Sequence, residues 1–399
     1  MTTAKNNVCY FQSGGPTQVI NSSFLGLFDT FRKDPKRGKF YVSRFGVNGL
    51  LNGELESVIF KRDFSSLLFT PGANFGSARV KLPEDLNAIE WQNIRKTIEK
   101  YRIGYLFVNG GNDSMDTANK ISLRAKEKKR NLKVIGIPKT IDNDLLFTDH
   151  CPGFGSAAKR VANASIAIQK DDYSYQTGRI NILETRGRDS GFLAASSLLA
   201  KKKGLAPDFI YVPESAFDLK TFLDKAISRY KEKGHCFIVV SEGIRNKEGK
   251  LILASKDKDS FGNIQNGGVA DYLASLLSNR GRKTRGIELS LLNRAGTFLP
   301  SFTDIKEAYE CGKRAYIFAT LGTSGKRVVR KRLSSKPYRI TYVDVPLSRV
   351  ANKAKKMPLS YLTTSGDNIR DSYLDYVSPL IQGERKVFGP DGLLSVFGK

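Results

Sequence analysis

The chain has 399 residues, 40% of them hydrophobic and 26% charged, a composition typical of a soluble globular protein with more than one domain. Lysine and arginine together number 65 and aspartate and glutamate 39, so the net charge of +26 favours anionic partners. The basic residues are spread along the chain, however, and zinc-finger spacing and an aromatic RNA-binding signature are both missing, so we expect no specific nucleic-acid partner.

The four cysteines, Cys9, Cys151, Cys236 and Cys311, lie far apart and show no paired spacing, which favours reduced thiols in a cytoplasmic protein. The sequence contains no apolar N-terminal signal segment and no apolar run long enough to cross a bilayer. We therefore predict a cytoplasmic location and no membrane partner.

A strand, a glycine loop and a helix are predicted at the start of the chain. Residues 8–12 are strand-like, and residues 20–32 have helical character. Gly14 and Gly15 lie between them, where glycine lets the backbone come close to a phosphate; a structural tight turn is the alternative. This alternation of short strands and helical stretches continues along the chain, which indicates parallel βαβ units.

A strand over residues 40–42 follows, then a loop rich in glycine and asparagine over residues 45–53 and a helix over residues 86–101. Arg79 comes after the loop sequence PGANFGSA, from which it can reach the same sheet edge as the glycine loop. A surface position is the alternative for an isolated arginine.

Residues 104–159 form the stretch around which the chain is organised. In its first half, residues 105–108 predict a buried strand, and Ser114 begins a helical segment after a glycine turn. Free backbone N–H groups at such a helix start attract anions. Asp113 would repel a phosphate unless a cation intervened, so this place is either a metal site or a charge that limits how much phosphate fits.

In the second half, Lys139, Thr140, Asp142 and Asp144 follow a strand over residues 134–137. Alternate side chains of an extended segment share a face, so both carboxylates would point together. Such a pair suits a base beside a metal ligand, and the lysine can neutralise a transferring phosphoryl group. A plain turn is the alternative, but a second glycine-rich loop at the same sheet edge favours a site.

Residues 153–170 begin with a glycine-containing loop and continue as a long helix. Strands are predicted after it over residues 179–183, 209–212 and 236–240. Glu242 directly follows the last of these, where it can accept hydrogen bonds from a bound ligand or, alternatively, cap a helix or turn. For His150 we expect a structural hydrogen-bonding role.

The rest of the chain predicts a loop over residues 259–268, a helix over residues 304–320, and a strand, an extended segment and a final helix within residues 338–384. Arg285 and Arg294 flank an apolar run, and the planar guanidinium suits a sugar phosphate because it binds through two hydrogen bonds.

Several motifs occur in an order that covers nearly the whole chain. They are QSGGPTQVINSS, PGANFGSAR, GGNDSMDTA, PKTIDNDL, TDHCPGFGSAAK, ETRGRDSGFLAA, PDFIYVPES, VVSEGI, NRAGTFLPSFTDIKEA and YVSPLIQGE. Together they resemble the phosphofructokinase family, and specifically its pyrophosphate-dependent branch. The resemblance implies an α/β fold with two interwoven Rossmann-like domains and parallel-rich sheets.

For the domains, we expect residues 1–140 with about 265–303 to bind the phosphoryl donor, and residues 141–264 with about 304–399 to bind the sugar phosphate. The implied reaction is reversible phosphoryl transfer from pyrophosphate to the 1-hydroxyl of fructose 6-phosphate, with Mg²⁺ bridging the donor's oxygens. A homodimer or homotetramer is expected.

The resemblance also assigns roles to residues of this chain. Asp142 would take the hydroxyl proton, Thr140 would orient the reacting groups, and Lys139 and Arg79 would stabilise negative charge. The expected donor-binding residues are Gly14, Gly15, Asp113 and Ser114, and the expected metal ligands are Asn112 and Asp144. The expected substrate-binding residues are Thr140, Asp142, Arg186, Gly187, Arg188, Glu242 and Arg294. Arg179 and Arg285 are also expected to bind substrate, by reaching into a neighbouring subunit's site.

Asn293 replaces the usual glutamine of the family pattern, a small change, and four further positions also depart from that pattern. Arg186 stands where methionine is usual, Leu291 replaces histidine or tyrosine, Phe192 replaces tryptophan, and Asn112 replaces an aspartate that binds metal in ATP-using relatives. An additional guanidinium at Arg186 either strengthens sugar-phosphate binding or displaces it.

The donor prediction depends on Asp113 and Lys139, because ATP-dependent relatives usually have glycine at both positions. Three alternatives stay open: an ATP-dependent phosphofructokinase, a catalytically weak paralogue that binds sugar phosphate, and a polyanion-binding protein.

Overall fold

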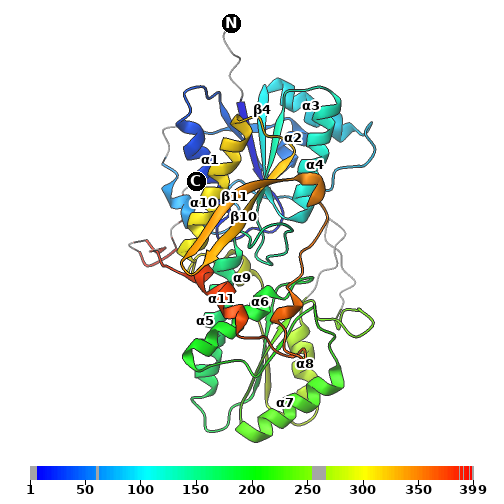
Figure 1. Ribbon diagram of the computed structural model, residues 1–399, viewed down its shortest axis with the longest axis vertical. Coiled ribbons are helices and arrows are strands. Elements are labelled where there is room, and N and C mark those ends of the chain that lie inside the picture. The colour runs from blue at the N-terminus through cyan, green and yellow to red at the C-terminus, as the bar shows by residue number, and fades with distance from the viewer. Residues whose placement is uncertain are drawn as a thin grey trace.

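The protein is represented by a computed structural model that describes residues 7–59, 63–253, 267–385, 387–389, 391–394 and 396–397. Most of the loop predicted over residues 259–268 lies outside these residues. Figure 1 shows two α/β domains, one around a larger sheet and one around a smaller sheet. The α/β class predicted from the sequence is thereby confirmed.

The larger domain is built on a seven-stranded sheet with the order β11-β10-β5-β4-β1-β2-β3. Its central strands run parallel, and the edge strands β3 and β11 are antiparallel to their neighbours. The strands are β1 (Asn7–Gln12), β2 (Phe40–Ser43), β3 (Leu55–Ser57), β4 (Ile103–Gly110), β5 (Lys133–Pro138), β10 (Lys326–Ser335) and β11 (Tyr338–Pro346).

Helices cover both faces of this sheet because its inner strands are apolar on both sides. In β1, Val8 and Tyr10 face the helices α1 (Ile20–Arg32) and α10 (Phe302–Thr320). Cys9 and Phe11 point the other way. That second face packs against α2 (Asn48–Asn52), α3 (Ile89–Lys100) and α4 (Asn112–Glu127). The region predicted as a loop over residues 45–53 therefore contains a short helix.

The smaller domain has a four-stranded parallel sheet with the order β7-β8-β6-β9. Its strands are β6 (Ile180–Thr185), β7 (Phe209–Tyr211), β8 (Cys236–Ser241) and β9 (Thr284–Glu288). One face packs against α5 (Phe154–Asp172), α6 (Phe192–Ala195) and α11 (Ser372–Val377), and the other against α7 (Leu219–Lys233) and α8 (Val269–Ser278). The short helix α9 (Ser290–Ala295) follows β9, and the 3₁₀ segments are η1 (Ser65–Leu68), η2 (Ser196–Lys203), η3 (Leu347–Arg349), η4 (Leu359–Tyr361) and η5 (Ser378–Ile381).

The sheets divide the chain differently from the expected domain boundaries. Strand β9 was expected in the first domain, but it pairs with β6 in the smaller sheet. Strands β10 and β11 were expected in the second domain, but β10 pairs with β5 and so extends the larger sheet. Alternating sequence patterns indicate a strand without indicating which open sheet edge it will cover, so the sheet to which β9, β10 and β11 belong is not readable from the sequence.

Helix α10 belongs to the larger domain because two glycines let it approach α1 closely. A Cβ atom on Gly26 would lie 1.8 Å from the carbonyl oxygen of Tyr309, and one on Gly312 would lie 1.8 Å from that of Ser23. Only glycine fits at either position without moving a backbone.

The four cysteines are buried and free. Within the described ranges, no helix combines the length and apolar character needed to cross a membrane.

Candidate active site

A cleft of about 720 Å³ opens where the carboxyl ends of the strands of both sheets face each other. Parallel α/β sheets bind ligands at this edge because loops and helix N-termini converge there. The larger domain contributes Gly14, Gly15, Pro16, Thr17, Arg79, Gly111, Asn112, Asp113, Ser114, Lys139, Thr140, Ile141, Asp142 and Asp144. Arg186, Arg188, Asp189, Glu242, Ser290, Leu291, Arg294, Asn352 and Ala354 complete the lining.

The loops after β1 and β4 meet at one end of the cleft. Gly14 has a left-handed backbone with φ 75°, and a Cβ atom there would lie 3.3 Å from Lys139 Nζ and 3.9 Å from Ser114 Oγ. Helix α4 begins beside it with no side chain capping its N-terminus, and Asp113 lies in its first turn. Backbone N–H groups thus point to this end of the cleft while a carboxylate restricts it.

Lys139 connects the loop after β5 to the loop after β1. Its side chain is 4% exposed, and its ammonium donates a hydrogen bond to the carbonyl oxygen of Gly15 over 2.5 Å. Burial, followed by the neighbouring positive charges of Arg294 and Arg79, lowers the pKa of Lys139 to about 7. An anion bound beside this group would favour its charged form.

Asp142 and Asp144 both line the cleft, but the chain bends at Ile141 and Asp142 and is left-handed at Asn143, so it is not the expected extended segment. Asn143, between them, is fully buried with φ 60°. The Asp142 N–H donates to Thr140 Oγ1 over 3.1 Å. Asp142 Oδ1 is buried and has no hydrogen-bond partner among the described residues, so it is available to accept a proton from a ligand.

Asn112 and Asp144 offer oxygen atoms suited to a hard cation. Asn112 Nδ2 donates to Asp144 Oδ2 over 3.1 Å, while Asn112 Oδ1 is buried without a partner among the described residues. Burial, followed by the neighbouring charge of Asp142, raises the pKa of Asp144 to about 6. In the described part of the chain no three histidine, cysteine, aspartate or glutamate side chains cluster in a metal-binding arrangement. The pair fits Mg²⁺, which takes few protein ligands and completes its shell with water and phosphate oxygens.

Glu242 faces the acidic loop from the smaller domain. Its side chain is buried and accepts a hydrogen bond from the Gly187 N–H over 3.2 Å, and Arg186 lies 3.7 Å from the same oxygen. Burial raises the pKa of Glu242 to about 7, against the effect of Arg186. Gly187 itself does not line the cleft; it supports Glu242 instead.

Two further arginines line the cleft. Arg294, on α9, packs against Gly15: a Cβ atom there would lie 3.2 Å from its Cδ. Burial lowers the pKa of Arg294, and the positive charge of Arg186 lowers it further. Arg188 pairs with Asp189 over 3.1 Å. The cleft is therefore rich in guanidinium groups, which suit phosphate.

Arg179 and Arg285 lie away from this cleft. Arg179 directly precedes β6, and Arg285 is opposite Asn181 near the start of β9, so both are at the amino end of strands whose carboxyl ends reach the cleft. Their contact with a neighbouring subunit stays a prediction.

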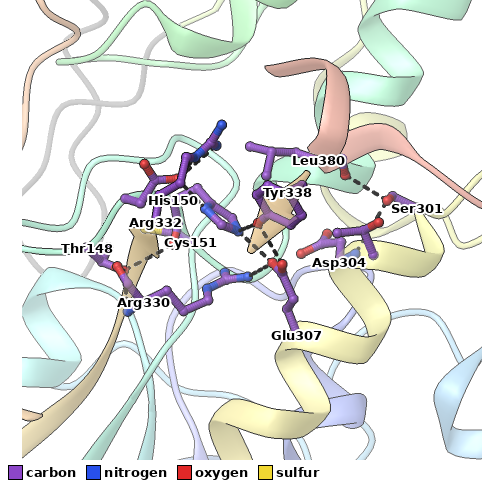
Figure 2. A network of polar contacts seen from close by, with 12 residues as sticks. Thr148, His150, Cys151, Ser301, Asp304, Glu307, Arg330, Arg332, Tyr338 and Leu380 are labelled. Carbon is purple, nitrogen blue, oxygen red and sulfur yellow. Dashed lines mark hydrogen bonds and ion pairs between the residues drawn. The ribbon is translucent and has the colours of Figure 1, made fainter. Parts of the chain in front are cut away.

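The expected structural role of His150 is confirmed. Its ring is 1% exposed, with Nδ1 2.7 Å from Asp149 Oδ2 and Nε2 2.6 Å from Glu307 Oε2. Figure 2 shows His150, Arg330 and Tyr338 converging on Glu307, which α10 carries.

Comparison with known proteins shows the family to which the chain belongs. The family model described as phosphofructokinase matches residues 7–319. The chain belongs to the phosphofructokinase family.

Relatives within the family span nearly the full chain. The chain is 39% identical to the pyrophosphate–fructose 6-phosphate 1-phosphotransferase of Xanthomonas campestris pv. campestris, covering 97% of this chain and 94% of that protein. It is 32% identical to the sulfofructose kinase of Alkalicoccus urumqiensis, covering 88% and 90%. The crystal structure of the pyrophosphate-dependent phosphofructokinase of Nitrosospira multiformis matches with a TM-score of 0.88 and 35% identity, over 99% of this chain and 96% of that one.

Some cleft residues of this family member were not anticipated from its sequence. Asp189 directly follows Arg188 and lines the cleft, but neither its residue type nor its position in the sequence assigns it a role. Asn352 and Ala354 lie in an irregular segment that reaches the cleft because Ala354 pairs with Leu145 and the Lys355 N–H donates to the Asp144 carbonyl oxygen over 2.6 Å. No local pattern in that segment signals these long-range contacts.

Proposed function

We propose that this member of the phosphofructokinase family transfers a phosphoryl group reversibly from pyrophosphate to the 1-hydroxyl of fructose 6-phosphate, giving fructose 1,6-bisphosphate and phosphate. The observation that carries the proposal is that Asp142, Lys139 and Asp113 line a single cleft. Relatives named pyrophosphate–fructose 6-phosphate 1-phosphotransferase support it.

In this proposal, Asp142 accepts the proton of the sugar's 1-hydroxyl through its unpartnered Oδ1. The hydroxyl oxygen forms a bond to the terminal phosphorus of pyrophosphate, the bridging P–O bond breaks, and phosphate leaves with that electron pair. Lys139 and Arg79 stabilise the negative charge on the transferring group, and Thr140 orients the loop through its hydrogen bond from the Asp142 N–H.

Asn112 and Asp144 are the proposed ligands of a divalent cation, Mg²⁺. When bound, Mg²⁺ neutralises charge on the donor's oxygens. On the sugar side, Glu242 accepts hydrogen bonds from hydroxyl groups, and Arg186, Arg188 and Arg294 bind the sugar phosphate.

Pyrophosphate is the proposed donor because the cleft is narrowed where a nucleotide would extend. The Lys139 side chain fills the space beside Gly14, and Asp113 puts a carboxylate in the first turn of α4. Glycine in place of Lys139 would free this space, and glycine in place of Asp113 would remove the carboxylate that repels a third phosphate group.

Steady-state assays with fructose 6-phosphate, Mg²⁺ and either pyrophosphate or ATP test the donor. We expect kcat/KM for pyrophosphate to exceed that for ATP by about 100-fold or more, since ATP would both clash with the Lys139 side chain and be repelled by the Asp113 carboxylate. Strong activity with ATP and none with pyrophosphate would overturn the proposal. Binding of fructose 6-phosphate without turnover of either donor would instead favour a regulatory paralogue.

Sulfofructose is a second candidate acceptor. Leu291 lines the cleft where the family usually has a polar residue, so this site offers one polar group fewer to the sugar's anionic end. A sulfonate, with one negative charge, needs fewer such contacts than a phosphate. Comparing kcat/KM for the two sugars with pyrophosphate as donor distinguishes the candidates.

We further propose a cytoplasmic homodimer or homotetramer. Arg179 and Arg285 lie outside the cleft of their own chain, which supports a contribution to a second subunit's site, and the four buried free thiols suit a reducing compartment. Sedimentation of the wild type gives the assembly state, and loss of fructose 6-phosphate affinity in Arg285→Ala would support the shared site.

A further inference from the structure

The acidic loop is tied to the C-terminal helix α11 by the residue between its two carboxylates. Asn143 points into the protein, where its Nδ2 donates to the hydroxyl oxygen of Tyr376 over 2.7 Å. Its Oδ1 accepts a hydrogen bond from the Cys151 N–H over 3.0 Å. Because Asp142 and Asp144 flank Asn143, its side-chain hydrogen bonds anchor the segment that carries both carboxylates into the cleft.

The Tyr376 hydroxyl holds the loop at a second point. It accepts from Asn143 and donates to the carbonyl oxygen of Asp149 over 2.8 Å, so one hydroxyl group joins the beginning and the end of the loop. Both of its hydrogen-bonding directions are thus used by the loop, and a phenylalanine ring would lose both contacts without losing volume.

Tyr376 is itself fixed by its surroundings. The Arg332 guanidinium lies 4.8 Å from the centre of the Tyr376 ring and donates to the Tyr376 carbonyl oxygen over 3.0 Å. The same guanidinium donates to Asp149 Oδ2 over 2.9 Å. Figure 1 shows α11 at the level where the two domains meet, so the hydroxyl reaches the loop from a helix that packs on the smaller domain.

The far end of the loop is held by the buried ionic cluster of Figure 2. His150 lies between Asp149 and Glu307, and Arg330 donates to the same Glu307 carboxylate over 2.5 Å. The loop therefore has a fixed end at this cluster, and the hydrogen bonds of Asn143, together with that of the Lys355 N–H to the Asp144 carbonyl oxygen, hold the part in the cleft relative to it.

We propose that Tyr376 is a positioning residue for the phosphoryl transfer, acting through Asn143 on Asp142 and Asp144. The inference rests on the proposed function, because it assumes that these two carboxylates serve the reaction. Asn143 has a left-handed backbone with φ 60°, a conformation that asparagine adopts more readily than most residues, and its side chain is held by the hydrogen bonds to Tyr376 and Cys151. A loop that relaxes by a fraction of an ångström weakens proton transfer more than it weakens binding of the sugar.

The test compares Tyr376→Phe with Tyr373→Phe, a matched control in the same helix. The Tyr373 hydroxyl donates to the Phe192 carbonyl oxygen over 2.6 Å and lies 3.1 Å from Ser196 Oγ, so its removal costs comparable hydrogen bonds without involving the loop. We expect kcat to fall about 10- to 100-fold in Tyr376→Phe, with less than about a threefold change in KM for fructose 6-phosphate. Tyr373→Phe should keep kcat within about twofold of the wild type.

Hydrogen–deuterium exchange provides a readout that does not depend on activity. Amide exchange in residues 140–149 should become faster in Tyr376→Phe and stay unchanged in Tyr373→Phe, with similar thermal unfolding midpoints for both variants. Equal kcat values in the two variants together with unchanged exchange would overturn the proposal. If the wild type does not transfer phosphate from pyrophosphate, the proposed function fails, and the exchange experiment still decides whether Tyr376 positions the loop.

Discussion

Lys139 Nζ lies 2.5 Å from the carbonyl oxygen of Gly15, which joins the loop after β5 to the loop after β1 across the floor of the cleft. The contact places a buried cation between two phosphate-approach loops. Burial lowers the pKa of this lysine to about 7, so keeping the lysine charged in the folded protein costs free energy. Binding of an anion beside it would offset that cost.

Replacing this lysine should raise the stability of the protein and strongly lower kcat. In wild type, the pKa of Lys139 is 10.5 when the chain is unfolded and about 7 when it is folded, so between these pH values the unfolded chain binds one proton more. Wild-type stability therefore rises with pH over this window. Lys139→Met should be more stable than wild type by about 3–5 kcal/mol below pH 7, and the difference should shrink as the pH approaches 10.5.

Thermal unfolding midpoints of both proteins between pH 6 and 9.5 provide the measurement. We expect kcat of Lys139→Met to fall about 100- to 1000-fold, because the charge on the transferring group loses its partner. Lys313→Met, on the exposed side of α10, is the control and should show no pH-dependent gain. A Lys139→Met protein that is less stable than wild type at pH 6 would contradict the assigned burial cost.

Asn112→Asp should tighten metal binding. The substitution puts a second carboxylate beside Asp144 and keeps the side-chain shape, and more charged ligands raise the affinity of a site for hard cations. We expect the Mn²⁺ or Mg²⁺ dissociation constant, measured by calorimetry without substrates, to fall about tenfold. An unchanged constant would mean that Asn112 is not a ligand.

Arg186→Met restores the residue that is usual in the family and tests the charge next to Glu242. Ionised Glu242 accepts hydrogen bonds from the sugar, so kcat/KM for fructose 6-phosphate should fall as the pH drops below the pKa of about 7. Arg186 lies 3.7 Å away and lowers that pKa, so its removal raises it. The fall in kcat/KM should begin at higher pH in Arg186→Met than in wild type; coincident pH profiles would disprove the coupling.

Gly312→Ala should destabilise the larger domain. The new methyl group would lie 1.8 Å from the Ser23 carbonyl oxygen, so α10 must move away from α1. We expect a loss of about 3 kcal/mol or more, seen as a decrease of about 5–10 °C in Tm. Lys313→Ala, the next residue on the same helix, should change Tm by no more than about 1–2 °C; a similar decrease there would remove the packing explanation.

Much of the fold was predictable because buried parallel strands and their glycine loops leave strong local patterns. Helix α1 begins and ends where the sequence predicts, and Gly14, Asp113 and Asp142, each of which follows a predicted strand, all line the cleft. Such loops follow strands, and parallel strands carry them to one edge.

The rest depends on contacts between distant parts of the chain. The membership of β9, β10 and β11 in their sheets is decided by which edge is open, and the sequence pattern of a strand does not encode that edge. The left-handed conformation of Asn143 was not predicted, because its side chain is held by Tyr376, which lies more than 200 residues away in the sequence. Ala354 reaches the cleft through a pairing with Leu145 that no local motif announces.

The most direct test of the central claim is the Asp142→Asn variant, which keeps the shape of the side chain and removes its basic oxygen. We predict that kcat with pyrophosphate and fructose 6-phosphate falls about 100- to 10,000-fold, while the dissociation constant for fructose 6-phosphate, measured by calorimetry, stays within about threefold of wild type. A variant that retains wild-type kcat would contradict the assignment of Asp142 as the base that accepts the sugar's proton.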